Sequence, residues 1–171
     1  MWGPNFSTGM ILLDEMSLDE AVHFQNHSAK VVGLVDMSKF TKAADKTKRA
    51  DHALVIMFQP FMGGWVQALA AFASAGAVPG DTLQKIVLEA IILTENNGYF
   101  VDGVASDGAS WNRAMWDMFG ISKEKNSCEH PVDPERELHF ASDFPHLMKN
   151  LWVRVVTQKE LEVRERGGQI S

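Results

Sequence analysis

The stretch 99-YFVDGVASDGASWNRAM-115 decides the fold, because it reads in turn as a strand, an acid, a tight turn and a helix. The apolar run from Tyr99 to Ala105 is typical of a buried strand. Asp107-Gly108 interrupts this run, Ser110 is the expected N-cap of the helix, and Gly120 lies just past its expected end. A carboxylate that ends a central strand beside a glycine can present a metal ligand, although Asp-Gly is also a common turn.

The composition is ordinary for a soluble globular domain. With 171 residues, 46% hydrophobic and 22% charged, the chain suits one domain with a sizeable core. The net charge of -6 argues against binding nucleic acid by electrostatics alone. The single cysteine, Cys128, excludes an intrachain disulfide and a cysteine zinc cluster, which favours a reducing compartment. We expect no membrane span, because no apolar run approaches roughly 18 residues, and no basic leader precedes an apolar stretch.

In the first half of the chain, the sequence pattern predicts mainly strands. Residues 10–13 read as a strand that stops at the paired acids Asp14-Glu15, and residues 22–24 and 30–35 read as a hairpin. Residues 40–51 are polar and read as an exposed loop. A basic DNA-contacting strip is the alternative for this region, weakened by interleaved acids; its members are Lys39, Lys42, Lys46, Lys48 and Arg49.

In the second half of the chain, the sequence pattern predicts strands that alternate with helices. Residues 53–58 form the clearest buried strand, while residues 65–75 fit either a helix or a returning strand. A helix capped by Asp81 follows and ends at Asn97-Gly98. Beyond the central stretch, residues 122–135 read as a loop and residues 137–142 as a strand ending at Asp143. Asp143 is the expected N-cap of a last helix, whose apolar stripe comprises Leu147, Met148, Leu151, Trp152, Val155 and Val156.

This order of elements indicates an α/β fold, a mixed sheet with helices on its faces. Three of the predicted strands end in acids, namely Asp14, Asp107 and Asp143. Carboxylates that meet at strand ends supply the hard oxygen ligands that Mg²⁺ and Mn²⁺ prefer. A two-metal site of this kind can activate a water or a 3′-hydroxyl against a phosphodiester.

The chain resembles the RNase H-like catalytic domain of P-element-type transposases. The matching segments, in the family's order, are LLDEM (12–16), VVGLVD (31–36), HALVIMF (52–58), PGDTL (79–83), SDGASWNR (106–113) and ELHFASDFPHLMKN (137–150). The resemblance implies an RNase H-like mixed β-sheet flanked by helices and incomplete at the C-terminus. It assigns residues 1–156 to this domain and residues 157–171 to a charged tail.

The resemblance also assigns the site. It makes Asp14 the first and Asp107 the second catalytic acid, and both are expected to bind Mg²⁺ or Mn²⁺. In this family the third acid is a glutamate on a later helix, beyond a nucleotide-binding insertion domain, and we expect neither within this chain. Metal binding by the remaining two acids is expected to be weak. Ser106 stands where the family often has cysteine, and Trp152-Val153 where it tends toward Arg-Asn.

Two functions remain open at this point. In the first, the chain is a fragment or a domesticated copy of a P-element-like DNA transposase of the DDE/D lineage. It would then descend from a metal-dependent enzyme of DNA strand cleavage and transfer, and would be inactive alone. In the second, it is a non-enzymatic module that binds nucleic acid or protein, and its aspartates only cap turns and helices. The resemblance implies a nuclear protein, DNA as a partner bound through additional domains, and a homo-oligomer.

Several other residues have a structural interpretation that outweighs a functional one. Asp143 fits a helix cap better than a further metal ligand, and His146 fits the edge of the core better than a phosphate contact. Glu15 should point to the sheet face opposite Asp14, which leaves it outside the site. Aromatic residues expected in the core rather than as base-stacking platforms are Trp111, Trp116 and Trp152.

Overall fold

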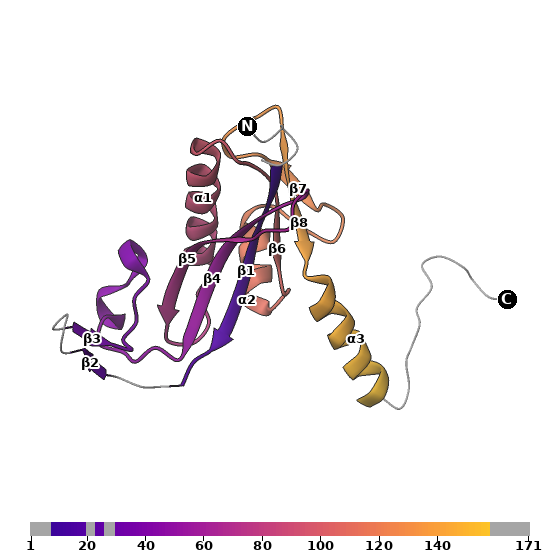
Figure 1. Ribbon diagram of the computed structural model, residues 1–171. Helices are drawn as coiled ribbons and strands as arrows, with labels where there is room; N and C mark the ends of the chain where they lie inside the picture. Colours follow the sequence, from indigo (N-terminus) through magenta and orange to yellow (C-terminus); the bar gives the residue numbers. More distant parts are fainter. Residues whose placement is uncertain (1–7, 20–22, 26–29, 158–171) are drawn as a thin grey trace.

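The computed structural model describes residues 8–19, 23–25 and 30–157, and its centre is a six-stranded mixed sheet (Figure 1). The strand order is β5-β4-β1-β6-β8-β7. The bounds are β1 Thr8–Ser17, β4 His52–Pro60, β5 Gln67–Ser74, β6 Phe100–Ser106, β7 Ser127–Glu129 and β8 Glu137–Ser142. Strands β1, β6 and β8 are parallel, whereas β4, β5 and β7 run antiparallel to their neighbours. The predicted α/β class and mixed sheet are confirmed.

Three helices and a small hairpin complete the described part of the chain. The helices are α1 Gly80–Asn96, α2 Ser110–Met118 and α3 Phe144–Thr157. The hairpin pairs β2 His23–Gln25 with β3 Lys30–Val32, much as predicted. Two short 3₁₀ turns, Ser38–Phe40 and Ala43–Asp45, follow it. None of the described helices is both long and apolar enough to cross a bilayer.

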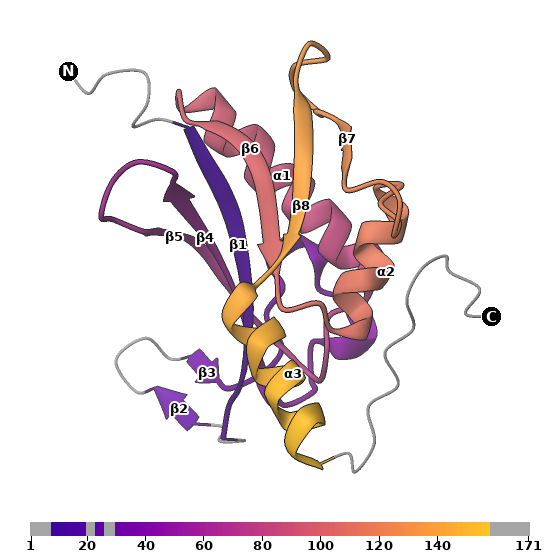
Figure 2. The same ribbon diagram turned by 90° about the vertical axis from the view of Figure 1, so that its right-hand side faces the viewer.

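The hydrophobic core lies between one sheet face and the helices α1 and α2. Alternate residues of β1, such as Ile11 and Leu13, are buried on this face, and α1 adds a buried stripe that includes Leu83 and Ile91. The two helices approach closely at Gly80, where a Cβ atom would lie 2.9 Å from the Ala114 Cβ. No described helix covers the other sheet face, to which β1 contributes the half-buried Met10 and Leu12 and the exposed Asp14 (Figure 2).

Two predictions of element bounds were wrong, and one segment left open between helix and strand took the strand form. Strand β1 does not stop at Asp14-Glu15 but continues to Ser17, because β4 pairs with it as far as the register Ser17↔His52. The ambiguous segment 65–75 forms strand β5, whose register with β4 satisfies its backbone groups at the edge of the sheet. The predicted loop 122–135 contains the short strand β7, which pairs with β8.

Two predicted helix caps were also wrong. Helix α1 begins at Gly80 with Pro79 as its N-cap, so Asp81 lies inside the first turn. Helix α2 begins at Ser110 itself, and its N-cap residue Ala109 makes no side-chain cap. The carboxylate of Asp107 instead accepts a hydrogen bond from the Ala109 backbone N–H at 2.9 Å. Ser110 therefore does not cap this helix, and Asp107 binds the backbone of the residue directly before it.

Helix α3 starts directly after Asp143, as predicted, but projects beyond the ends of β6 and β8 (Figures 1 and 2). Met148, Leu151 and Val156, which belong to its predicted apolar stripe, are therefore exposed instead of buried. Trp152 is 69% exposed, so the prediction that it lies in the core was wrong. Trp111 and Trp116, by contrast, are half-buried and pack against the core as predicted. A stripe shows that a helix has an apolar face but not what covers that face.

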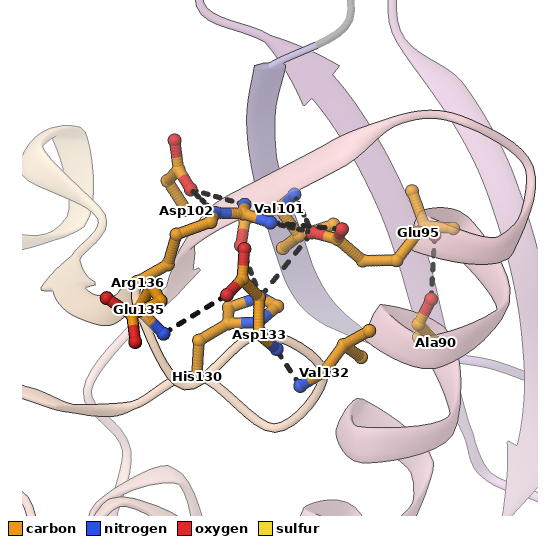
Figure 3. Close-up of polar contacts among 10 residues, drawn as sticks. Ala90, Glu95, Val101, Asp102, His130, Val132, Asp133, Glu135 and Arg136 are labelled. Carbon is orange, nitrogen blue, oxygen red and sulfur yellow. Dashed lines mark hydrogen bonds and ion pairs between the residues drawn. The ribbon is translucent and has the colours of Figure 1, made fainter.

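A polar network closes the opposite end of the sheet, where β6 begins (Figure 3). Arg136 donates to both carboxylate oxygens of Glu95 at 3.0 Å and to Asp102 Oδ1 through Nε at 3.1 Å. The fully buried His130 ring contacts the Val101 carbonyl at 2.9 Å through Nε2 and accepts two backbone N–H bonds on Nδ1. Since Nδ1 accepts, the ring is the tautomer with its proton on Nε2. The network joins α1, β6 and the β7–β8 connection.

Candidate metal centre

The two predicted metal ligands come from neighbouring parallel strands. In the register of β1 with β6, Leu12 pairs with Ala105. Asp14 lies two residues further along β1, and Asp107 directly follows Ser106, the last residue of β6; both side chains line the same cavity. The structure thus brings together the two acids that the sequence singled out.

Both acids line one cavity of about 400 Å³ on the open sheet face. Its floor is apolar and is made by side chains of β1, β4, β6 and β8, including Met10, Leu12, Met57, Ala105 and Ala141. Phe144 and Pro145, at the start of α3, close one side. The carboxyl ends of β6 and β8 meet at this end of the sheet, where α3 begins (Figure 2). The acids therefore occupy a hollow beside apolar walls rather than a flat surface.

The Asp107 carboxylate is held in a fixed orientation by α2. Its Oδ1 accepts hydrogen bonds from the Ala109 N–H at 2.9 Å and from Asn112 Nδ2 at 2.6 Å. Asn112 is 5% exposed, so packing restrains its side chain as well. Both of these bonds end on Oδ1, which leaves Oδ2 to serve as a ligand atom. Asn112 had no predicted role, although the spacing Asp-Gly-Ala-Ser-x-Asn could have indicated one.

Glu15 lies on the opposite, helix-covered face of β1, as predicted. Its Oε1 accepts a long hydrogen bond of 3.4 Å from the Val78 N–H, and its buried Oε2 forms none. Burial raises the pKa of Glu15, and the negative charge of Asp107 raises it further, while Val78, His52 and the Trp111 indole oppose this change. Glu15 is therefore outside the cavity, although the negative charge of Asp107 contributes to its raised pKa.

The structure supports a role in metal or DNA binding less for Asp143, for His146 and for the basic strip. Asp143 is half-buried and lines the same cavity, and its backbone N–H donates to the Ser106 carbonyl at 2.7 Å. In the described ranges, however, no three acidic, histidine or cysteine side chains lie close enough to hold a metal together. The side chain of His146 lies outside the described residues. The basic strip is partly neutralised, because Lys39 pairs with Glu89 at 2.6 Å and Lys48 with Asp45 at 2.7 Å.

The donor set of this cavity fits a divalent ion of the Mg²⁺ or Mn²⁺ type. Asp14 and Asp107 offer carboxylate oxygens, which are the hard ligands these ions take. Mg²⁺ keeps several waters and often binds through only one or two carboxylates plus substrate phosphates. The cavity leaves room for both. Soft metals that need thiolate or several imidazoles do not match these two acids.

Comparisons with known proteins agree with this fold. The family model of the TNP-like, RNase H N-terminal domain matches residues 4–120, more than half of the chain. A solved structure, the Drosophila P element transposase strand transfer complex, is similar with a TM-score of 0.68 and 21% sequence identity. The match covers 88% of this chain but only 30% of that transposase chain. No curated protein sequence matches significantly.

Proposed function

Because the chain belongs to the family of TNP-like RNase H N-terminal domains, we propose that it carries part of a transposase active site for metal-dependent DNA strand cleavage and transfer. The observation that supports this proposal is that Asp14 in β1 and Asp107, directly after the paired parallel strand β6, line one cavity. These two acids would hold Mg²⁺ or Mn²⁺. A bound divalent ion supplies Lewis-acid stabilisation of the oxygens of a phosphodiester.

The residues of this chain contribute position and charge to such a reaction. Asp14 reaches the cavity from β1 and is exposed, so substrate phosphate and water have access to it. Asp107 is fixed by the two hydrogen bonds from α2, so its free oxygen does not need to be ordered when a ligand binds. The apolar floor excludes water from below the carboxylates, and this strengthens their interaction with a cation.

We further propose that the 171-residue chain alone binds metal weakly and cleaves DNA only in traces. Attack on a phosphodiester in a two-metal site requires that both the attacking and the leaving oxygen be clamped. Two carboxylates hold one ion, and misplacement by about 1 Å can cost about a hundredfold in rate. The net charge of -6 adds a repulsive surface toward DNA. Activity would then require partner segments or chains that bring a third acid and a basic DNA-binding surface, in a nuclear setting.

The test is a nicking and joining assay on labelled duplex DNA with Mn²⁺, using the chain Met1–Ser171, Asp107→Asn, and Asp117→Asn as a control. Asp117 is exposed at the far end of α2, so its substitution changes the net charge but not the cavity. We expect traces of product at most from all three proteins. Robust nicking by the wild type and by Asp117→Asn that is lost in Asp107→Asn would show a complete active site and would overturn this part of the proposal.

A second function, a non-enzymatic interaction module, is favoured by one observation. Helix α3 exposes a set of large apolar side chains: Phe144, Met148, Leu151, Trp152, Val153 and Val156. Exposed apolar surface of this kind marks a site of interaction. If Mn²⁺ binds nowhere near Asp14 and Asp107 but α3 variants change the oligomeric state, the module is the better account.

A further inference from the structure

We propose that a small cavity at the start of α1 binds a phosphate group through the end of the helix, the Thr82 hydroxyl and the Lys42 ammonium group. This α1 cavity shares no lining residue with the candidate metal centre. The inference goes beyond the proposed function and does not depend on metal binding. The phosphate is either free in solution or part of a DNA backbone, and the experiment distinguishes these two sources.

The first step is the size and position of the α1 cavity. Its volume is about 170 Å³, and it lies between residues 35–48 and the connection from β5 to α1, residues 74–79. Sites for drug-sized ligands measure roughly 300–1,000 Å³, so this cavity suits a small ion instead. Its polar lining includes Thr41, Lys42 and Thr82, which can all donate hydrogen bonds.

The second step is the uncapped start of α1. The N-cap residue Pro79 and Thr82 in the first turn both line the cavity, and no side chain caps the helix. Within the part of the chain that the structure describes, the N–H groups of Gly80 and Asp81 have no acceptor. Free N–H groups together with the positive end of the helix dipole attract an anion.

The third step is the hydroxyl of Thr82, which points to a ligand independently of the helix end. Thr82 is 8% exposed, and its hydroxyl forms no hydrogen bond with any described residue. Two comparable buried hydroxyls do have partners: Ser74 donates to the Gly76 carbonyl at 2.9 Å, and Thr94 donates to the Ala90 carbonyl at 2.7 Å. A buried hydroxyl without a partner is costly, and an anion in the cavity would supply the missing acceptor.

The fourth step is the charge around the α1 cavity. Two acids lie at or near it, but each already has a cation, since Asp45 pairs with Lys48 at 2.7 Å and Asp81 with Lys85 at 3.8 Å. Lys42 also lines the cavity and forms no ion pair within the described ranges. The charge that is left without a partner at this cavity is therefore positive.

These groups match a phosphate better than a carboxylate or a water molecule. The Thr41 hydroxyl oxygen accepts the Met37 N–H at 2.8 Å, so its proton stays available for an acceptor in the cavity. Donors then reach the cavity from two segments, Thr41 and Lys42 on one side and Thr82 with the helix end on the other. A phosphate presents acceptor oxygens in several directions, whereas a carboxylate presents only two. A water molecule would not balance the charge of Lys42.

The experiment titrates inorganic phosphate into the ¹⁵N-labelled full chain at constant ionic strength, without divalent metal, and follows the amide signals of Gly80 and Asp81. The variants are Lys42→Met and Thr82→Val, which keeps the side-chain shape and removes the hydroxyl. The matched control is Lys46→Met, an exposed lysine of the basic strip that does not line the cavity. Urea midpoints report folding, and Thr82→Val should keep or raise the midpoint because the hydroxyl it removes has no partner.

A second arm identifies the source of the phosphate. A short fluorescent DNA duplex is titrated with the same four proteins, again without metal, at several salt concentrations. If the site takes a DNA phosphate, Lys42→Met and Thr82→Val should weaken duplex binding more than Lys46→Met does, and Lys42→Met should lower the salt dependence by about one counterion. If the site takes free phosphate, Lys42→Met and Thr82→Val should bind the duplex no more weakly than Lys46→Met.

We expect inorganic phosphate to shift the Gly80 and Asp81 signals in the wild type and in Lys46→Met. Lys42→Met and Thr82→Val should each raise the phosphate dissociation constant about tenfold, the order expected for the loss of one hydrogen bond to a charged group. A DNA affinity that depends on both Lys42 and Thr82 would support the site equally.

Two results would overturn the inference. The first is that inorganic phosphate leaves both amide signals unshifted while duplex binding is the same in all four proteins. The second is that Thr82→Val binds both probes like the wild type, because the cavity would then play no part even if Lys42→Met binds more weakly. Neither readout involves a metal, so these results would leave the proposed metal centre untouched, and loss of that centre would leave the phosphate site untouched.

Discussion

Replacement of Arg136 by methionine should destabilise the protein strongly, although the residue lies at the end of the sheet opposite the candidate metal centre. The guanidinium bridges Glu95, whose side chain is 7% exposed, and Asp102 (Figure 3). Burial would by itself lower the pKa of Arg136, but the hydrogen bonds to Glu95 and Asp102 outweigh it and raise that pKa. Methionine keeps most of the side-chain volume and removes the charge and every donor.

The size of this loss follows from what remains behind. Removing one partner of a fully buried ion pair costs about 3–5 kcal/mol, because the other charge is left without compensation. Here the Arg136 side chain is 22% exposed and that of Asp102 is 35% exposed, so water reaches part of the network. We therefore expect a loss of about 2–3 kcal/mol, which is well above the 0–1 kcal/mol of an ordinary surface pair.

Urea denaturation at neutral pH measures this loss as the change in midpoint at constant slope. The control is Arg113→Met, an exposed position on α2, which should stay within about 0.5 kcal/mol of wild type. Adding Glu95→Gln to Arg136→Met should recover about 1 kcal/mol, since it removes the stranded buried charge. A loss below about 0.5 kcal/mol for Arg136→Met, or no recovery in the double variant, would refute the idea that this network holds the end of the sheet.

Two further predictions concern the packing of the helices and the loss of stability at low pH. Gly80→Val should lower the free energy of unfolding, measured in urea, by about 1–3 kcal/mol, because its Cβ would lie 2.9 Å from the Ala114 Cβ and 3.1 Å from the Met115 nitrogen. The control Gly64→Ala, whose Cβ would have no atom within 4 Å, should change it little. Equal effects of the two substitutions would contradict the close approach of α1 and α2. The Gly76 N–H, at 2.5 Å, and the His52 ring lower the pKa of Asp51. The ionised Asp51 carboxylate therefore stabilises the folded state at pH values above its ordinary pKa of 3.8. This stabilisation is lost as the pH falls through the lower pKa that Asp51 has in the folded protein. Asp51→Asn should destabilise the protein at neutral pH, with the difference from wild type shrinking below that value, and a difference that stays constant down to pH 2 would contradict this sign.

The sequence sufficed for the class of fold, because that class depends on local patterns, whereas the metal-binding role of Asp14 and Asp107 stays a prediction of the resemblance. Apolar runs marked β4, β6 and β8, and the acids after or within such runs marked Asp14 and Asp107. The bounds of β1 were not predictable, since its extension past Asp14 depends on pairing with β4, which is distant in sequence. The same holds for β5, where helical spacing of apolar residues competed with the edge of a sheet.

The details of the site depended on contacts that no local pattern reveals. Serine is a good helix cap, so Ser110 was a sound expectation, but the helix begins at Ser110 itself, and the turn at Gly108 brings the Asp107 carboxylate to the N–H of the preceding residue, Ala109. Asn112 gains its role from this turn. Glu15 was placed correctly on the opposite face, whereas its hydrogen bond from the Val78 N–H depends on how the connection into α1 packs on the sheet. The boundary of the domain at residue 156 stays a prediction.

The central claim is that Asp14 and Asp107 form one site for a divalent cation, and paramagnetic relaxation tests it most directly. Sub-stoichiometric Mn²⁺ is added to ¹⁵N-labelled protein, and the loss of each amide signal is recorded for the wild type, Asp107→Asn and Asp117→Asn. The account predicts that signals at the carboxyl ends of β1 and β6 broaden first in the wild type and in Asp117→Asn, and that Asp107→Asn abolishes this effect. Broadening centred elsewhere, or unchanged in Asp107→Asn, would contradict it.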